Sequence, residues 1–123
     1  MTTLADPAVL EEVARDPTSL TLRLVPAHAR AACAGHFPGD PLIPGSRLAG
    51  LGATAAAALL ATERGVHWRF TGVQRATFSS PARPSAQIEL RAERAGDDGR
   101  VAVEITGDGD PLAWIALRFE VVP

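Results

Sequence analysis

The residue types that could do chemistry are concentrated between residues 35 and 45. This segment reads Gly-His-Phe-Pro-Gly-Asp-Pro-Leu-Ile-Pro-Gly, with three prolines and three glycines, and it ends where a helix is expected to begin. A backbone so restricted can hold the imidazole of His36 near the free N–H groups at the helix start. Those N–H groups and the helix dipole suit a carbonyl oxygen that gains negative charge. A base beside such a site is what removal of a proton next to a thioester carbonyl requires.

A long helix is expected directly after this segment, over residues 45–64. After Arg47 the chain carries no charge until Glu63, and Gly65 marks the expected end of the helix. A helix that is apolar all round its circumference must be covered on several sides. Its many alanines and glycines would let neighbouring elements approach the backbone closely.

Most of the remaining chain is strand-like. The run 20–25 alternates apolar and polar residues, which predicts a half-buried strand. The second half predicts four further strands, and two Gly/Asp turns at 96–99 and 107–110 are typical of antiparallel hairpins; the expected strands are 67–78, 87–93, 100–106 and 112–121. Residues 8–14, after Asp6-Pro7, are expected to form a short helix, and residues 26–44 a loop.

These elements predict one α+β domain over residues 1–123. An antiparallel sheet that curls round the long helix would bury it economically. Because the sheet can cover only part of the helix, we expect a second subunit to cover the rest, and therefore at least a dimer. The spacing of the strand aromatics predicts core positions for Trp68, Phe70, Phe78, Trp114 and Phe119.

The composition argues against several classes of function. The chain is 46% hydrophobic with a formal net charge of -2, which disfavours disorder and electrostatic capture of nucleic acid or membrane. The single cysteine, Cys33, rules out an internal disulfide and is expected to be a packing residue. The three histidines are not spaced as metal ligands; His28 is expected at the surface and His67 in a structural role. With acidic residues near the N-terminus, we expect a cytoplasmic protein.

The segment 35–45 resembles a motif of the hotdog-fold 3-hydroxyacyl-acyl-carrier-protein dehydratases of fatty-acid and polyketide assembly. The run 70–78, followed by Pro81 and Pro84, resembles the family's strand after the helix and the loop beyond it. The compact N-terminal part is most similar to the small dehydratases of aryl-polyene pathways. The resemblance implies a hotdog fold, an antiparallel sheet wrapped round one long central helix, and hydro-lyase activity.

The resemblance also implies roles for individual residues. His36 matches the histidine that removes the α-proton, and Gly45 matches the glycine whose N–H polarises the thioester carbonyl. The family carries a Glu or Asp fourteen residues after the histidine to protonate the departing hydroxyl, but here that position is Gly50. One helical turn later, where the family often has glutamine, this chain has Thr54. Losing a positioned general acid typically costs about 10²- to 10⁴-fold in rate.

Residues around this motif are the candidates for substrate binding: Phe37, Pro44, Ser46, Arg47, Gly50 and Thr54. Ser46 could donate a hydrogen bond to the substrate, or could be only a polar residue of the first helical turn. Arg47 shares a helical stripe with the empty acid position. It could hold a phosphate or carboxylate of the ligand, or face solvent or an interface.

The resemblance also implies how the protein assembles. In the family, each active site takes its histidine from one subunit and its acid from the other. A homodimer of this chain would have two sites with a base and no acid, whereas a heterodimer with an acid-bearing homologue would have one complete site. The substrate would be carried on the phosphopantetheine of an acyl carrier protein, with no other cofactor. Because carrier proteins are acidic, Arg69, Arg75 and Arg83 are candidate docking residues.

Other functions remain open. A double-bond isomerase needs one base to remove and return a proton, and it needs no acid at Gly50. A non-catalytic half of a heterodimer would lose nothing when His36 is replaced. A hotdog thioesterase is the weakest alternative, because such enzymes usually activate water with the helix carboxylate that is missing here.

Overall fold

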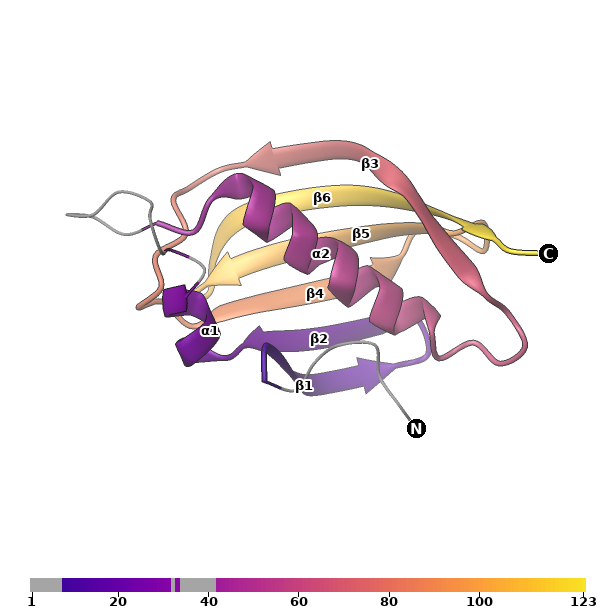
Figure 1. Ribbon diagram of the computed structural model, residues 1–123, viewed down its shortest axis with the longest axis horizontal. Helices are drawn as coiled ribbons and strands as arrows, with labels where there is room; N and C mark the ends of the chain where they lie inside the picture. The colour runs from indigo at the N-terminus through magenta and orange to yellow at the C-terminus, as the bar shows by residue number, and fades with distance from the viewer. Residues whose placement is uncertain (1–7, 32, 34–41) are drawn as a thin grey trace.

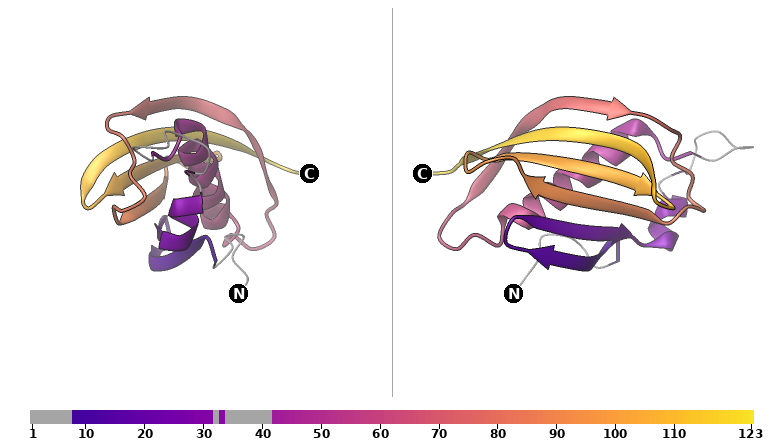
Figure 2. Two further views of the ribbon diagram at one scale, coloured as in Figure 1. Left: turned by 60° about the vertical axis from the view of Figure 1, so that its left-hand side comes forward. Right: turned by 180° about the vertical axis from the view of Figure 1, so that it is seen from behind.

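The computed structural model describes residues 8–31, 33 and 42–123. Six antiparallel strands form one sheet in the order β1-β2-β4-β5-β6-β3, and a long helix, α2, crosses one of its faces (Figure 1). The sheet curves around that helix (Figure 2). The elements are β1 Leu10–Asp16, β2 Ser19–Leu24, α1 Pro26–Ala31, α2 Gly45–Leu60, β3 Trp68–Phe78, β4 Ile88–Arg94, β5 Arg100–Gly107 and β6 Asp110–Val121.

The predicted α+β architecture and its hairpins are confirmed. The two Gly/Asp turns join β4 to β5 and β5 to β6, and each of these pairs is antiparallel. The turns place Gly99, Asp108 and Gly109 at positive φ, a conformation that glycine adopts without a steric penalty. The strand predicted over residues 20–25 is also present, as β2, one residue earlier.

Three local predictions were wrong. Residues 8–14 do not form a helix, because residues from Leu10 onward pair with β2 to build the edge strand β1; this pairing overrides a local helix-start signal. The segment 26–44 is not all loop, since α1 occupies its first residues. The helix α2 ends at Leu60, short of Gly65, because residues 61–63 bond back as single turns.

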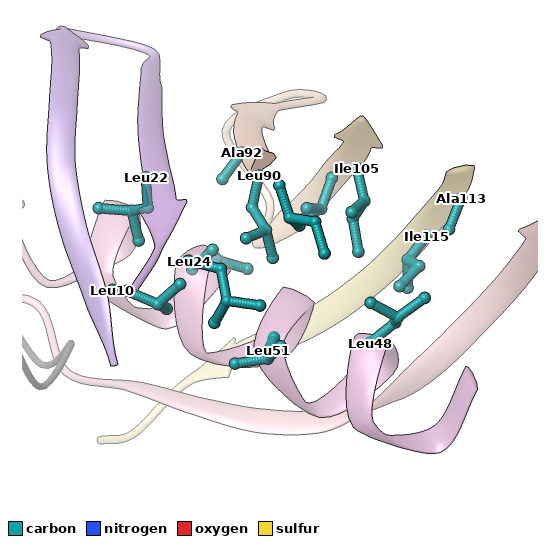
Figure 3. Close-up of a cluster of buried hydrophobic side chains, with 14 of the residues drawn as sticks. Leu10, Leu22, Leu24, Leu48, Leu51, Leu90, Ala92, Ile105, Ala113 and Ile115 are labelled. Atoms are coloured by element: carbon teal, nitrogen blue, oxygen red, sulfur yellow. The ribbon is translucent and has the colours of Figure 1, made fainter. Parts of the chain in front are cut away.

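The core lies between the sheet and α2. Side chains of α2, including Leu48 and Leu51, are directed toward the sheet side chains (Figure 3). Gly52 lies on the face of α2 that contacts the sheet, and it lets the helix backbone pack close to the strands. A Cβ at this position would lie 3.2 Å from the Cδ1 of Ile115 and 3.9 Å from Val103. The predicted close approach to the helix backbone is therefore confirmed, and a bulkier residue here would push α2 off the sheet.

One flank of this core is uncovered in the single chain. The edge strand β3 leaves Phe70 45%, Val73 45% and Phe78 49% exposed, and Trp114 is 42% exposed. The predicted core position was therefore wrong for Phe70, Phe78 and Trp114, whereas Phe119 is buried and Trp68 is partly buried. For Phe70 and Phe78 the reason is placement, because β3 is the last strand of the sheet in the described part of the chain. Trp114 lies within the sheet, on β6, and lines a surface hollow with Arg91 and Glu104 of the neighbouring strands.

Two turn glycines give a matched test of the hairpins. Gly99 and Gly109 have nearly the same φ, 83° and 87°. A Cβ at Gly99 would collide with the backbone oxygen of Phe119 and come within 2.8 Å of Trp68, whereas at Gly109 it would meet nothing within 4 Å. We expect Gly109→Ala to cost roughly 1 kcal/mol from conformation alone and Gly99→Ala roughly 2–4 kcal/mol, measured by urea unfolding. Equal costs would contradict this packing.

Candidate active site

The helix α2 begins with backbone donors that have no acceptor within the helix. Pro44 precedes it in an extended conformation, and no side chain among the described residues caps the helix. The carbonyl of Pro44 accepts the N–H groups of Arg47 at 3.0 Å and Leu48 at 3.1 Å, so the earlier N–H groups, from Gly45 and Ser46, have no acceptor within the helix. The positive end of the helix dipole adds to the attraction for negative charge at this point.

The start of α2 is fixed by the loop that follows β3. The N–H of Ile43 donates to the carbonyl of Ala82 at 2.8 Å, and both residues are buried. The N–H of Ser79 is likewise bonded to the carbonyl of Leu112 in β6, at 2.8 Å. The helix start and this loop are therefore held in one arrangement by backbone hydrogen bonds.

A hollow of about 500 Å³ opens at this helix start. Its walls are mostly apolar, and they include Pro44 and Gly45 together with the ring of Phe78. A Cβ at Gly45 would lie 3.3 Å from the Cε1 and Cζ atoms of that ring. Glycine at this position therefore lets an exposed aromatic ring lie directly on the first residue of the helix, where it forms a wall beside the free N–H groups.

A second hollow, of about 300 Å³, lies on another side of α2. Ser46, Arg47 and Gly50 line it together with His28 and Leu51. A Cβ at Gly50 would meet nothing within 4 Å, so the position that carries no side chain opens onto free space. The structure thus divides the predicted binding residues between two hollows along the first turns of α2.

The remaining predicted site residues have different surroundings. The hydroxyl of Thr54 donates to the carbonyl of Gly50 at 3.1 Å, one turn back along the helix. Arg69 pairs with Glu120 at 3.2 Å across β3 and β6, while Arg75 in β3 and Arg83 in the loop after it are exposed. The predicted base His36 and the neighbouring Phe37 lie outside the described residues.

Two lining residues were missed by sequence analysis. His28 was assigned to the surface because α1 was not predicted, and Phe78 was assigned to the core because alternation alone does not reveal that β3 is an edge strand. No local signal marks His28 as a neighbour of Gly50. For Phe78, the available signal was its place at the end of a strand, directly before the loop that meets the helix start.

Other chemistries find little support in the described part of the chain. It contains no group of three or more His, Cys, Asp or Glu side chains that could hold a metal ion. Burial raises the pKa of the Cys33 thiol, whose sulfur lies 3.4 Å from the carbonyl oxygen of Ala29; a protonated thiol is a poor nucleophile. No helix among the described residues has the length and apolar character needed to cross a membrane.

Comparison with known proteins places this geometry in a family. Residues 12–113 match the ApeI-like family model, described as ApeI dehydratase. Two curated relatives are named 3-hydroxyacyl-[acyl-carrier-protein] dehydratase FabZ. The protein from Syntrophobacter fumaroxidans is 38% identical over 61 residues, 46% of this chain and 42% of the relative. The protein from Polynucleobacter necessarius is 34% identical over 85 residues, 64% of this chain and 57% of the relative. The chain thus matches about half the length of these relatives.

Solved structures share the fold over nearly the whole chain. The dehydratase heterocomplex ApeI:P from Xenorhabdus doucetiae has a TM-score of 0.73 at 18% identity and covers 97% of this chain and 98% of its own. AziG from S. sahachiroi has a TM-score of 0.76 at 16% identity, with 92% and 90% covered. The PaaI protein of E. coli, at 17% identity, has a TM-score of 0.71, with 90% and 82% covered. The fold is the α+β hotdog fold.

Replacing two glycines of α2 tests the contact between Phe78 and the helix start. Gly50→Ala should stabilise the chain by about 0.5–1 kcal/mol, because the position is open and alanine is the better helix former. Gly45→Ala should give no such gain, because its Cβ presses on the Phe78 ring. In a Phe78→Ala background, the effects of Gly45→Ala and Gly50→Ala on the free energy of unfolding should become more similar. The coupling energy between Gly45→Ala and Phe78→Ala should be about 0.5–2 kcal/mol, measured by urea unfolding. Equal gains at both glycines, with Phe78 present, would contradict the contact.

Proposed function

The chain belongs to the ApeI-like dehydratase family, and from that premise we propose that it is a subunit of a dehydratase acting on 3-hydroxyacyl thioesters. The observation that carries the proposal is the start of α2: Gly45, whose N–H has no acceptor within the helix, lines a mostly apolar hollow together with Phe78. Such a site suits the carbonyl oxygen of a thioester with its acyl chain against the apolar wall.

The proposed reaction removes water across the C2–C3 bond of the substrate. His36 takes a proton from C2, and the thioester oxygen, which gains negative charge, accepts the N–H of Gly45. The C3–O bond then breaks, the C2=C3 double bond forms, and the hydroxyl leaves as water with a proton from an acid. A single donor to such an oxygen is typically worth about 10²- to 10³-fold in rate.

We propose that the acid comes from a homologous subunit. Gly50 leaves open space where the family carries a carboxylate, so a site built from two copies of this chain lacks that group. The exposed apolar side chains of β3, Phe70 and Val73, together with the free edge of that strand, offer a surface for a second hotdog subunit. The dehydratase heterocomplex from Xenorhabdus doucetiae supports a mixed assembly.

The substrate carrier is the second partner in this proposal. The names of the two FabZ relatives support an acyl carrier protein as the donor of the thioester. In this proposal the acyl group is carried on phosphopantetheine, and the reaction takes place in the cytoplasm. Arg75 is exposed on β3 and Arg83 on the loop after it, both near Phe78 in the sequence. Arg69 lies near the start of β3. These arginines are the proposed contacts for an acidic carrier surface.

Gly50 also favours a second candidate, a double-bond isomerase. Moving a double bond needs a base that removes one proton and returns it elsewhere, and no hydroxyl leaves. A 2-enoyl thioester incubated with the purified chain separates the two functions: a shifted alkene without hydration supports the isomerase, whereas formation of the 3-hydroxyacyl thioester, the reverse of dehydration, supports the dehydratase.

Installing the missing carboxylate tests the proposed function directly. We expect Gly50→Glu to raise kcat of the purified chain on a 3-hydroxyacyl-carrier-protein substrate by about 10²-fold, within the range for a general acid. Gly50→Gln is the matched control: it should give a similar gain in helix stability without the gain in rate.

His36→Ala should abolish the dehydration by both the unmodified chain and the Gly50→Glu variant, because both need the base. The proposal is overturned if neither protein dehydrates the substrate, or if His36→Ala leaves the rate unchanged. Co-purification from the native source, followed by intact-mass analysis, is expected to yield a homologue that carries Glu or Asp at the position of Gly50.

A further inference from the structure

The hollow beside Gly50 contains a titratable side chain that comes from a different element. Of its five lining residues, four belong to α2 and the fifth, His28, comes from α1. Ala29 is the buried residue of α1, and its N–H donates to the carbonyl of Val25 at 3.0 Å, which closes the first turn of this helix. The N–H of His28 itself donates to the same carbonyl at 2.9 Å. His28 therefore stands in the first turn of α1 and lines the same hollow as Gly50.

We propose that His28 is the proton donor of this hollow and replaces the carboxylate that α2 lacks at Gly50. The inference rests on the proposed dehydration. A glycine with nothing within 4 Å of its absent side chain leaves room for the C3 hydroxyl of a substrate, and an imidazole lines the same space.

The other residues that line this hollow are unsuited to donate a proton to the leaving hydroxyl. Arg47 offers a guanidinium, a group that binds anions and is a poor source of protons in proteins. Gly50 and Leu51 have no titratable group, and a serine hydroxyl such as that of Ser46 is a far weaker acid than an imidazolium. Histidine is the side-chain type that both gains and loses a proton near neutral pH, which is what a reusable donor requires.

The step balances in protons and electrons. The base removes a proton from C2, and the C–H electron pair becomes the C2=C3 double bond as the C3–O bond breaks. The leaving oxygen takes the C–O pair and one proton from the His28 imidazolium, and departs as water. The base is left protonated and His28 neutral, and exchange with solvent returns both to their starting states.

This donor changes what a mixed dimer could do. In the proposed assembly, the hollow at Gly50 faces a base supplied by the other subunit. With His28 as the donor, that second site also has an acid, and in a homodimer each site would combine His36 of one copy with His28 of the other. The unmodified chain alone would then turn over slowly instead of being inactive.

The test is a double-mutant comparison on the full chain with a 3-hydroxyacyl-carrier-protein substrate. We expect His28→Gln to lower kcat of the unmodified chain by roughly 10²-fold. The same change in the Gly50→Glu background should lower kcat less than about twofold, because the carboxylate has taken over the donation. His67→Gln is the matched control, since His67 lines a different hollow beyond the other end of α2 and should not change the rate in either background.

Each outcome decides the matter. An equal fall in both backgrounds would show a structural role for His28 and overturn the inference, as would an unchanged rate in the unmodified chain. An unmodified chain without turnover, beside an active Gly50→Glu variant, would overturn it too, while leaving the proposed function intact. Failure of both proteins to dehydrate the substrate would overturn the proposed function and this inference together. His28→Asn and the thermal midpoint of each variant guard against misfolding as the cause of a lost rate.

Discussion

The close contact between a small-residue helix and a curved sheet is the constraint on which this structure depends. Gly52 of α2 leaves only 3.2 Å between its would-be Cβ and Ile115, so the helix axis lies near the strands and the sheet must bend around it. Alanines at 55 and 56 are fully buried on the same helix. The helix adds Leu48, Leu59 and Leu60 to the same core, whereas Phe70 and Val73 of the edge strand β3 stay exposed.

The start of α2, where the candidate site lies, is positioned by contacts with the end of β3 and the loop after it. The start of α2 is tied to the loop after β3 through Ile43 and Ala82, and the end of β3 lays the ring of Phe78 on Gly45. An uncapped helix terminus would ordinarily be solvated. Here the ring of Phe78 lies beside it, and Gly45 lines a mostly apolar hollow. Electrostatic interactions are stronger in apolar surroundings than in water.

Gly50 is the residue on which both proposals depend. A side chain at this position would meet nothing within 4 Å, and His28 of α1 lines the same hollow. Under the proposed function, a carboxylate is missing at this position, so the acid is supplied either by another subunit or by the imidazole of His28. The hydroxyl of Thr54, one turn later, is turned back to the carbonyl of Gly50 and satisfies the helix backbone.

The sequence by itself determined the family, the central helix and the antiparallel hairpins, because fixed motifs, turn glycines and alternation are local signals. It did not determine β1, because Asp6-Pro7 resembles the start of a helix and the local pattern therefore predicted a helix. The pairing of this segment with β2 makes it a strand. Nor did the sequence reveal that Phe78 stands at an open edge, or that His28 lies beside Gly50. Those facts depend on which strand ends the sheet and on where the six-residue helix α1 lies relative to the hollow beside Gly50. Both are decided by contacts between segments far apart in the chain, and no local pattern encodes them.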